Sequence, residues 1–393
     1  MCAALNFCLC LQQREKRQRK KHNKRIRMSR WAGGHAAPVL CAGVCCGSEQ
    51  LLATGAEAGE LTVWNHSGLP LSKLHVRNRE DVTCVAFSPL APCMLYASHG
   101  QSVSILDPRN LNTTVTELQN VVEEEINSLS VNEGGGVLAL ADDSGVVRIV
   151  DLQLEKVTRT LWKHDNICSS VTFRPHRPQS LVSAGLDMQV MLWSLPKVCP
   201  LWTCSLQDAS EGGGAGQIFN PPLAHCVDVA SCGDVFACAA EDGCVHLLRV
   251  SADSRLRERG AFKAHSQGAS QARFLNFLSH PYWLATGGND GLVALWDLSE
   301  NDVVLNNRKF KQNVTKKRTK GRAKTVKPQM GRDEHKDGSA HSALETGAEV
   351  KPKLCFNHKD KVNWVCPTML KGKPSLLVTD QSSSPTLYSL ENL

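Results

Sequence analysis

Two stretches of this 393-residue sequence contain a histidine, a hydroxyl residue and an aspartate, which are the residue types of a hydrolytic triad. In each stretch these residues recur at a similar spacing, and a tryptophan follows, whose indole N–H can only donate a hydrogen bond. The two sets are His164, Ser183, Asp187 and Trp193, and His265, Thr286, Asp290 and Trp296. Recurrence at a fixed position favours a structural role, and the sequence has neither a G-x-S-x-G nucleophile motif nor a phosphate-binding glycine loop. We therefore predict that the chain is not an enzyme.

Four cysteines recur every six residues, at Cys226, Cys232, Cys238 and Cys244, in a series that could suggest a metal site. Turn-forming residues at 231–234 and 241–243 interrupt any single strand that could place the four on one face. Because the series lacks paired C-x-x-C spacing, we expect small buried apolar side chains here, and neither a metal nor another cofactor.

The net charge of +7 is distributed unevenly along the chain. Residues 1–30 hold 10 Lys/Arg against 1 acidic residue, residues 31–305 hold 17 against 29, and residues 306–393 hold 18 against 8. The basic excess lies in 14–30 and in 308–327, and the second run has 10 basic and no acidic residues. Blocks of like charge repel themselves and are expected to be disordered, whereas the acidic body disfavours a phosphate-binding surface.

The apolar runs and the cysteine content of the sequence indicate the cellular compartment. No run approaches the roughly 20 apolar residues of a membrane-spanning helix, so we expect no integral membrane association. The apolar residues 1–11 precede the basic run, which is the reverse of a secretory signal, and the 17 cysteines are few for the chain length. We expect the nucleus and cytoplasm, although Cys2, Cys8 and Cys10 leave an acylated anchor open.

A repeated unit of about 43 residues runs through the sequence. It is clearest in 162–194 and 262–297, each of which passes from a histidine through three short β-rich stretches to a tryptophan. The first four units end 42 to 44 residues apart, and a glycine-rich insertion at 207–222 and a charged one at 306–350 account for longer intervals. The seven units end at Trp64, Leu106, Val150, Trp193, Leu248, Trp296 and Tyr388.

Short alternating runs such as 138–141 and 190–193, bounded by Asp-Gly, Ser-Gly or Asn-Asp-Gly turns, predict β-strands within each unit. Four strands per unit at this period predict an all-β fold, a seven-bladed β-propeller. We expect blades one to six in residues 28–305 and blade seven in 351–393. Residues 1–27 are then a disordered basic extension, and 306–350 a disordered basic insertion before the last blade.

The units resemble the WD-repeat family, most clearly units one, four and six. The resemblance implies a structural hydrogen-bond network that links a histidine, a serine or threonine, a turn aspartate and the terminal tryptophan, and both sets above match it. Unit one has His35, Thr54 and Trp64, but Ala58 stands at the aspartate position, so we expect an incomplete network and a looser blade. In this family the N-terminus usually supplies the outer strand of the last blade, a role that we assign to residues 28–33.

A narrower resemblance to one member of the family is carried by residues 97–107, 123–132, 166–195 and 358–364. The start of that member resembles the stretch from Met28 to Trp31. Met28 is therefore expected to be the usual initiator, and residues 1–27 an added upstream stretch.

Propellers of this family usually bind proteins, so we expect a monomeric, non-catalytic scaffold. One subclass docks onto the adaptor of cullin-RING ubiquitin ligases through a Trp-Asp-x-Arg motif at the end of a blade. Unit two ends in Leu106, Asp107 and Arg109, with leucine in place of tryptophan, whereas unit three lacks the arginine at 150–153. Our first hypothesis is a substrate receptor that uses these residues, and the alternative is an ordinary blade end with a solvated arginine.

The second hypothesis is a nuclear chromatin- or RNA-associated propeller that contacts nucleic acid only through the basic insertion. Two clusters within the insertion also suit recognition for nuclear import, and a solvated spacer is the alternative. The import candidates are Arg308, Lys309, Lys311, Lys316, Lys317 and Arg318.

Overall fold

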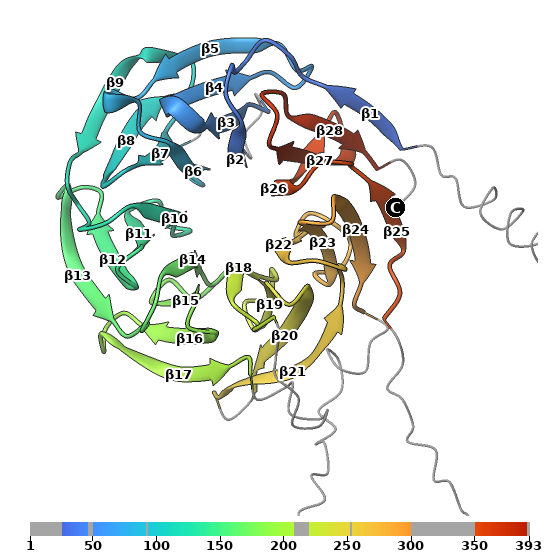
Figure 1. The fold of residues 1–393 in the computed structure, drawn as a ribbon. Helices are drawn as coiled ribbons and strands as arrows, with labels where there is room; N and C mark the ends of the chain where they lie inside the picture. Colours follow the sequence, from blue (N-terminus) through green and yellow to red (C-terminus); the bar gives the residue numbers. More distant parts are fainter. Residues whose placement is uncertain are drawn as a thin grey trace, which may run out of the picture.

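The chain forms a ring of seven four-stranded antiparallel sheets, the blades of a β-propeller (Figure 1). The structure is a computed structural model that describes residues 26–45, 50–91, 93–207, 220–251, 254–299 and 350–390, without the side chains of 112–114. Within these residues the helical elements are two single 3-10 turns, η1 (Glu57–Gly59) and η2 (Arg77–Arg79). The predicted all-β, seven-bladed fold is thus confirmed.

Each blade runs from an innermost strand outward, and the first two strands of every blade lie nearest the axis (Figure 1). The innermost strands are β2 (Val39–Val44), β6 (Val82–Phe87), β10 (Ile126–Val131), β14 (Cys168–Phe173), β18 (Ala224–Val229), β22 (Ala269–Phe274) and β26 (Val362–Leu370). The second strands are β3 (Leu52–Ala56), β7 (Leu95–His99), β11 (Val137–Asp142), β15 (Ser180–Gly185), β19 (Val235–Ala240), β23 (Trp283–Gly288) and β27 (Lys373–Asp380).

The third strands contain all seven unit ends that the repeat analysis identified. They are β4 (Glu60–Trp64), β8 (Ser102–Asp107), β12 (Val146–Asp151), β16 (Gln189–Ser194), β20 (Cys244–Val250), β24 (Leu292–Asp297) and β28 (Thr386–Ser389). The outer strands are β5 (Pro70–His75), β9 (Asn110–Leu118), β13 (Lys156–Trp162), β17 (Cys199–Ser205), β21 (Leu256–Lys263), β25 (Leu354–Asn357) and β1 (Arg27–Arg30).

Strand composition follows position in the blade. The third strand β16 buries Val190 to Trp193 as a continuous run, because a neighbouring blade covers each face of the sheet. The outer strand β5 alternates half-buried and exposed residues, because one of its faces meets water. The described core divides into seven apolar clusters, one at each interface between adjacent blades.

The antiparallel order gives the ring two different ends. Turns between second and third strands lie at one end, together with the connections from each outer strand to the next blade; we call this end the 2–3 face. The turns between first and second strands and between third and fourth strands lie at the other end, the 3–4 face. Residues 300–349, outside the described part, join β24 to β25, so they connect the third and fourth strands of blade six at the 3–4 face.

The innermost strand of every blade contains a bulge, and in five blades the bulge residue links the blade to the next one around the axis. The register shifts between the first and third residues of all seven innermost strands. In five blades the unpaired residue is polar and its side chain bonds to the first carbonyl of the next innermost strand, as Ser270 Oγ does to Val362 O at 2.6 Å. Blade one has Leu40 at this position, and His225 of blade five contacts Glu241 instead. Asn363 Nδ2 makes the corresponding bond to Val39 O at 3.0 Å, across the junction where the ring closes. The bulges therefore satisfy backbone groups that strand pairing leaves open.

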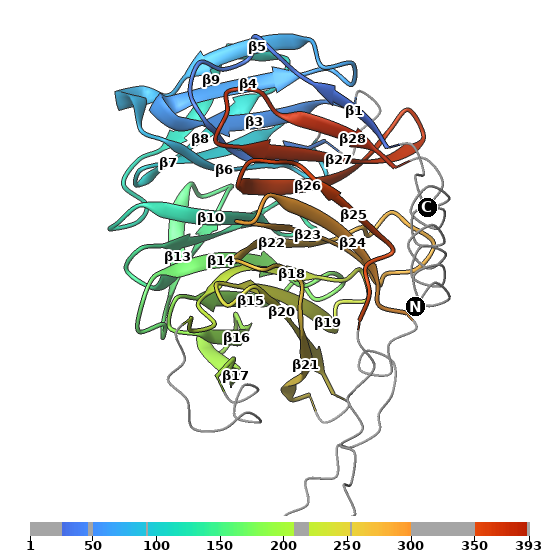
Figure 2. The ribbon, with the colours of Figure 1, turned by 45° about the vertical axis from the view of Figure 1, so that its right-hand side comes forward.

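Ring closure joins the two ends of the described chain. Strand β1 pairs with β28 in blade seven from Arg27 to Arg30, and the two strands lie side by side in both views (Figures 1 and 2). Trp31 follows, with its backbone N–H bonded to Pro385 O at 2.9 Å and its ring centroid 5.6 Å from that of Trp64 in blade one. This tryptophan therefore fills the apolar cluster between blades seven and one.

We predict that Trp31→Ala destabilises the fold by about 3 to 5 kcal/mol, because it empties a site where the ring is only 3% exposed. Trp162→Ala is the matched control, since that side chain is 62% exposed, and it should cost less than about 1 kcal/mol. Urea unfolding followed by circular dichroism measures both. Equal losses in the two variants would contradict closure through Trp31.

Candidate protein-interaction site

Blade four contains a continuous chain of side-chain hydrogen bonds at its 2–3 hairpin. Trp193 Nε1 donates to Ser183 Oγ at 2.8 Å, and Ser183 Oγ lies 2.8 Å from His164 Nε2. His164 Nδ1 lies 2.9 Å from Asp187 Oδ2. Because the indole can only donate, Ser183 Oγ accepts from it, and the Nδ1–H of His164 faces the Asp187 carboxylate. Ser183 is fully buried, so the arrangement stabilises the hairpin and exposes no nucleophile.

Blade six repeats this arrangement. Trp296 Nε1 bonds to Thr286 Oγ1 at 3.0 Å, and Thr286 Oγ1 lies 2.9 Å from His265 Nε2. His265 Nδ1 lies 2.9 Å from Asp290 Oδ1. The structure therefore brings together both predicted sets of four residues.

Blade one keeps three of the four residues and moves the carboxylate. His35 Nε2 lies 2.6 Å from Thr54 Oγ1, which accepts from Trp64 Nε1 at 2.7 Å. Ala58 occupies the turn position, and Glu60, two residues later, places Oε2 3.4 Å from His35 Nδ1. That nitrogen is buried without a hydrogen-bond partner in the described part, and Glu60 Oε2 accepts the backbone N–H of Ala36 at 2.7 Å.

Blade seven has a related network that the sequence reasoning missed. His358 Nε2 lies 2.8 Å from Asp380 Oδ2, and its Nδ1 lies 2.7 Å from the hydroxyl of Tyr388. His358 stands four residues before β26, the spacing that His164 has before β14, so this signal could have identified it. Bonds from His358 and Ser382 outweigh burial and lower the pKa of Asp380 to about 2.

Blades three and five replace the network with other buried ion pairs, which the sequence reasoning also missed. Arg148 in β12 donates to Asp142 at the end of β11. In blade five, His246 Nδ1 lies 2.8 Å from Glu258 Oε1. These basic residues lie on third strands rather than before the first strand, so the repeat spacing does not indicate them.

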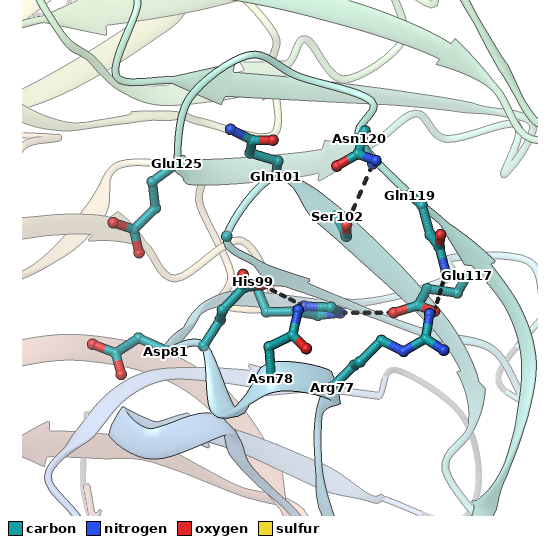
Figure 3. Close-up of a pocket in the computed structure, with 12 residues that line it drawn as sticks. Arg77, Asn78, Asp81, His99, Gln101, Ser102, Glu117, Gln119, Asn120 and Glu125 are labelled. Carbon is teal, nitrogen blue, oxygen red and sulfur yellow. Dashed lines mark hydrogen bonds and ion pairs between the residues drawn. The ribbon is translucent and has the colours of Figure 1, made fainter.

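Blade two has none of the four network residues, and a pocket opens at its 2–3 hairpin. By alignment of strand ends with blade four, the four positions hold Asn78, Ala97, Gln101 and Leu106. Asn78 and Gln101 line the pocket, which has a volume of about 570 Å³. We call it the blade-two pocket. Its lining residues are Arg77, Asn78, Glu80, Asp81, His99, Gly100, Gln101, Ser102, Glu117, Gln119, Asn120 and Glu125 (Figure 3).

His99 forms the floor of the blade-two pocket at the end of β7. Its Nε2 lies 2.9 Å from Ser104 Oγ, and its Nδ1 lies 3.4 Å from Glu80 Oε2. Glu117 lies 3.8 Å from the imidazole and 3.6 Å from the Arg77 guanidinium. Figure 3 shows Glu117 and Arg77 on one side of the pocket, and the carboxylates of Asp81 and Glu125 on the opposite side.

The end of β8 lies at the 3–4 face and holds the three residues of the adaptor hypothesis. Leu106 is fully buried in the cluster between blades one and two. Asp107 Oδ1 accepts from the backbone N–H and the Nε of Arg109, both at 3.0 Å, and Oδ2 accepts from Nη2 at 2.8 Å. These bonds lower the pKa of Asp107. The carboxylate therefore fixes the arginine, whose side chain stays 57% exposed.

Comparison with known proteins agrees with the repeat analysis. The family described as "WD domain, G-beta repeat" matches residues 155–194 and 257–297, which cover most of units four and six. These two segments are therefore WD40 repeats. The WD-repeat resemblance predicted from the sequence is thus confirmed, and it is clearest in the two blades whose networks are complete.

Similar proteins extend the match across the propeller. The narrower resemblance noted above is to WD repeat-containing protein 53, and it is carried by residues 97–107, 123–132, 166–195 and 358–364. The WD repeat-containing protein 53 homolog of Dictyostelium discoideum is 24% identical over 68% of this chain and 77% of the relative. Nuclear distribution protein PAC1 of Komagataella phaffii is 28% identical over 32% of the chain and 28% of the relative. U3 small nucleolar RNA-associated protein 21 of Saccharomyces cerevisiae is 25% identical over 36% of the chain and 15% of the relative.

The expectation of four buried cysteines is right for Cys226 and Cys238 and wrong for Cys232, which lies in an exposed turn, and Cys244 is half-buried. The import candidates in 308–318, Cys2, Cys8 and Cys10 lie outside the described residues. Among the described residues, no group of three or more His, Cys, Asp or Glu side chains could hold a metal, and no helix is long and apolar enough to cross a membrane.

The histidines of blades one and four differ in protonation, so we predict opposite effects of pH on stability. Burial lowers the pKa of His35 to about 4, below its ordinary 6.5. Burial also opposes the charge on His164, but Cys168 and Asp187 raise its pKa to about 10. The His35 contribution is therefore present above pH 6.5 and lost as the pH falls toward 4. The His164 contribution is present below pH 6.5 and lost as the pH rises toward 10. The change in stability is at most roughly 3 kcal/mol for His35 and roughly 5 kcal/mol for His164.

Free energies of unfolding, measured with urea from about pH 4 to 10, test this prediction. His35→Gln should flatten the acid limb of the WD-repeat propeller, and His164→Gln the alkaline limb. His176→Gln is the control, because that side chain is 76% exposed. Unchanged slopes in both network variants would show that the two imidazoles do not titrate as described.

Proposed function

We propose that this WD-repeat propeller is a non-catalytic interaction scaffold that serves as a substrate receptor of a cullin-RING ubiquitin ligase. Arg109, fixed at the end of blade two, is the residue that would contact the ligase adaptor. Proteins of this family are generally interaction scaffolds, which agrees with the coarser part of the proposal. We place the protein in the nucleus and cytoplasm and propose that the propeller acts as a monomer.

The observation that carries the proposal is the bidentate pair between Arg109 and Asp107. Corresponding aspartates close the third strands of blades three and six. There Asp151 accepts the backbone N–H of Gln153 at 2.9 Å, and Asp297 accepts that of Ser299 at 3.0 Å. Blade two thus differs from them in presenting a pre-oriented guanidinium at its end. A planar group held in one geometry loses little entropy when an acidic or carbonyl-rich surface binds it.

We predict that Arg109→Ala weakens adaptor binding about 30-fold or more, which corresponds to a contact of roughly 2 to 4 kcal/mol. The fold should be unaffected, because the side chain is exposed at a turn. Arg77→Ala is the matched control, since that arginine is 65% exposed, lies near a carboxylate and stands at the opposite face. Pull-down of the purified adaptor, with thermal unfolding of each variant, measures the effect. Equal recovery by wild type and Arg109→Ala, or recovery by neither, would refute adaptor docking through this turn.

A second candidate function is a nuclear role at chromatin or RNA through the basic run at 308–327. The observation that favours it is similarity to two proteins named U3 small nucleolar RNA-associated protein 21 or its homolog, at 25% and 28% identity. The run has 10 basic residues and no acidic one, whereas the propeller body is acidic. Phosphate contacts would therefore come from the run alone.

We predict that replacing 308–327 with a Gly/Ser segment of equal length abolishes RNA binding and lowers the nuclear fraction. Both effects follow from the loss of positive charge, and the melting temperature should not change. Fluorescence anisotropy with a labelled single-stranded RNA at about 50 and 200 mM salt tests the first part, because phosphate contacts weaken steeply over this range. Salt-independent binding, or binding retained by the variant, would exclude this role, and an unchanged nuclear fraction would exclude the import signal.

A further inference from the structure

The lining of the blade-two pocket holds more carboxylates than arginine or lysine side chains. Glu80, Asp81, Glu117 and Glu125 supply four carboxylates, and Arg77 is the one lysine or arginine among the described lining residues. Arg77 lies beside Glu117, on the side away from Asp81 and Glu125 (Figure 3). The half of the pocket around Asp81 and Glu125 therefore faces no cationic lining residue.

The pKa of Glu125 reflects this excess of negative charge. Burial, followed by the nearby charges of Asp143, Asp81 and Glu80, raises the pKa of its carboxyl group. Like charges raise a carboxyl pKa when no cation offsets them, so a positively charged group in this space would be favoured. Asp143 belongs to the 2–3 hairpin of blade three, which extends the negative region beyond the pocket toward the next blade.

The remaining lining suits an extended side chain that ends in N–H donors. Gln101, Gln119 and Asn120 supply amide groups, and Gln101 Nε2 is held by Glu123 O at 2.6 Å. The volume of about 570 Å³ lies within the usual range for ligand pockets. It greatly exceeds the space that a single ion requires, and no described group of residues has the arrangement of a metal site.

We propose that the blade-two pocket binds the side chain of a lysine or arginine from a basic segment of a protein partner. The cationic head lies between Glu80, Asp81 and Glu125, and the apolar stem passes the open mouth of the pocket. A charged head that meets several carboxylates in a partly enclosed site gains more than at a flat surface, because water screens it less. The proposal rests on this pocket and is independent of adaptor docking at Arg109.

Fluorescence anisotropy with fluorescein-labelled tetra-arginine and tetra-lysine peptides tests the proposal on the full chain. Glu125→Gln should weaken peptide binding roughly fivefold and leave the melting temperature unchanged or slightly raised, because it also removes the repulsion among the carboxylates. Glu133→Gln is the matched control. It makes the same change of charge at a 53% exposed side chain in the β10–β11 turn, on the 3–4 face. The preferred peptide identifies the head group as guanidinium or ammonium.

Four outcomes would overturn the proposal. The first is that neither peptide binds wild type, and the second is that the peptides bind Glu125→Gln as tightly as wild type. The third is an equal loss of affinity in Glu125→Gln and Glu133→Gln, which would indicate general attraction to an acidic protein. A gain in peptide affinity on replacing 308–327 with Gly/Ser would assign the pocket to the chain's own basic run instead of a partner. Adaptor pull-down with Glu125→Gln keeps the two proposals separate, because this change should leave recovery through Arg109 intact.

Discussion

A buried basic side chain paired with a carboxylate stands at the 2–3 hairpin of all seven described blades, and the rest of the ring depends on it. Each hairpin brings polar groups into the space between two blades, where an unpaired group would be costly. The pairs are His35 and Glu60, His99 and Glu80, Arg148 and Asp142, His164 and Asp187, His246 and Asp242, His265 and Asp290, and His358 and Asp380. What the blades share is a basic side chain beside a carboxylate at this position, and the residue types and the protonation of the basic group differ between blades.

These differences decide where the 2–3 face is filled and where it is open. Blades four and six carry the full network, and their histidines and aspartates occupy the hairpin. In blade one the carboxylate has moved from position 58 to Glu60, and a pocket of about 200 Å³ lies beside His35. In blade two all four network positions have changed, and the opening reaches about 570 Å³. The two described openings at the 2–3 face thus lie at blades that depart from the repeat pattern, whereas blades three and five depart from it and place Arg148 and His246 there instead.

The sequence predicted the ring because its strongest signals are periodic. His164, Ser183, Asp187 and Trp193 could be grouped because the same spacing recurs at 265–296, and the third strands could be placed by their terminal aromatic or aliphatic residues. The pair of Arg148 and Asp142 could not be predicted, because neither residue occupies a position of the repeated set of histidine, serine or threonine, turn aspartate and tryptophan. The bulge residues Thr83, Ser169, Ser270 and Asn363 were also missed. A small polar residue within a strand indicates no partner until the next blade places a carbonyl within its reach.

Strand β8 joins the two proposed binding positions in blade two. It begins at Ser102, which lines the pocket at the 2–3 face, and ends at Asp107, which holds Arg109 at the 3–4 face. Six residues of extended chain place these ends roughly 17 Å apart. The strand is paired on both sides, with β7 and β9, and Val103 to Leu106 are buried. Such a strand moves as a rigid part of its sheet, so a partner bound at one end is held at a fixed distance from whatever binds at the other. A scaffold that holds one protein in reach of another requires this rigidity, and it requires no conformational signal between the two faces.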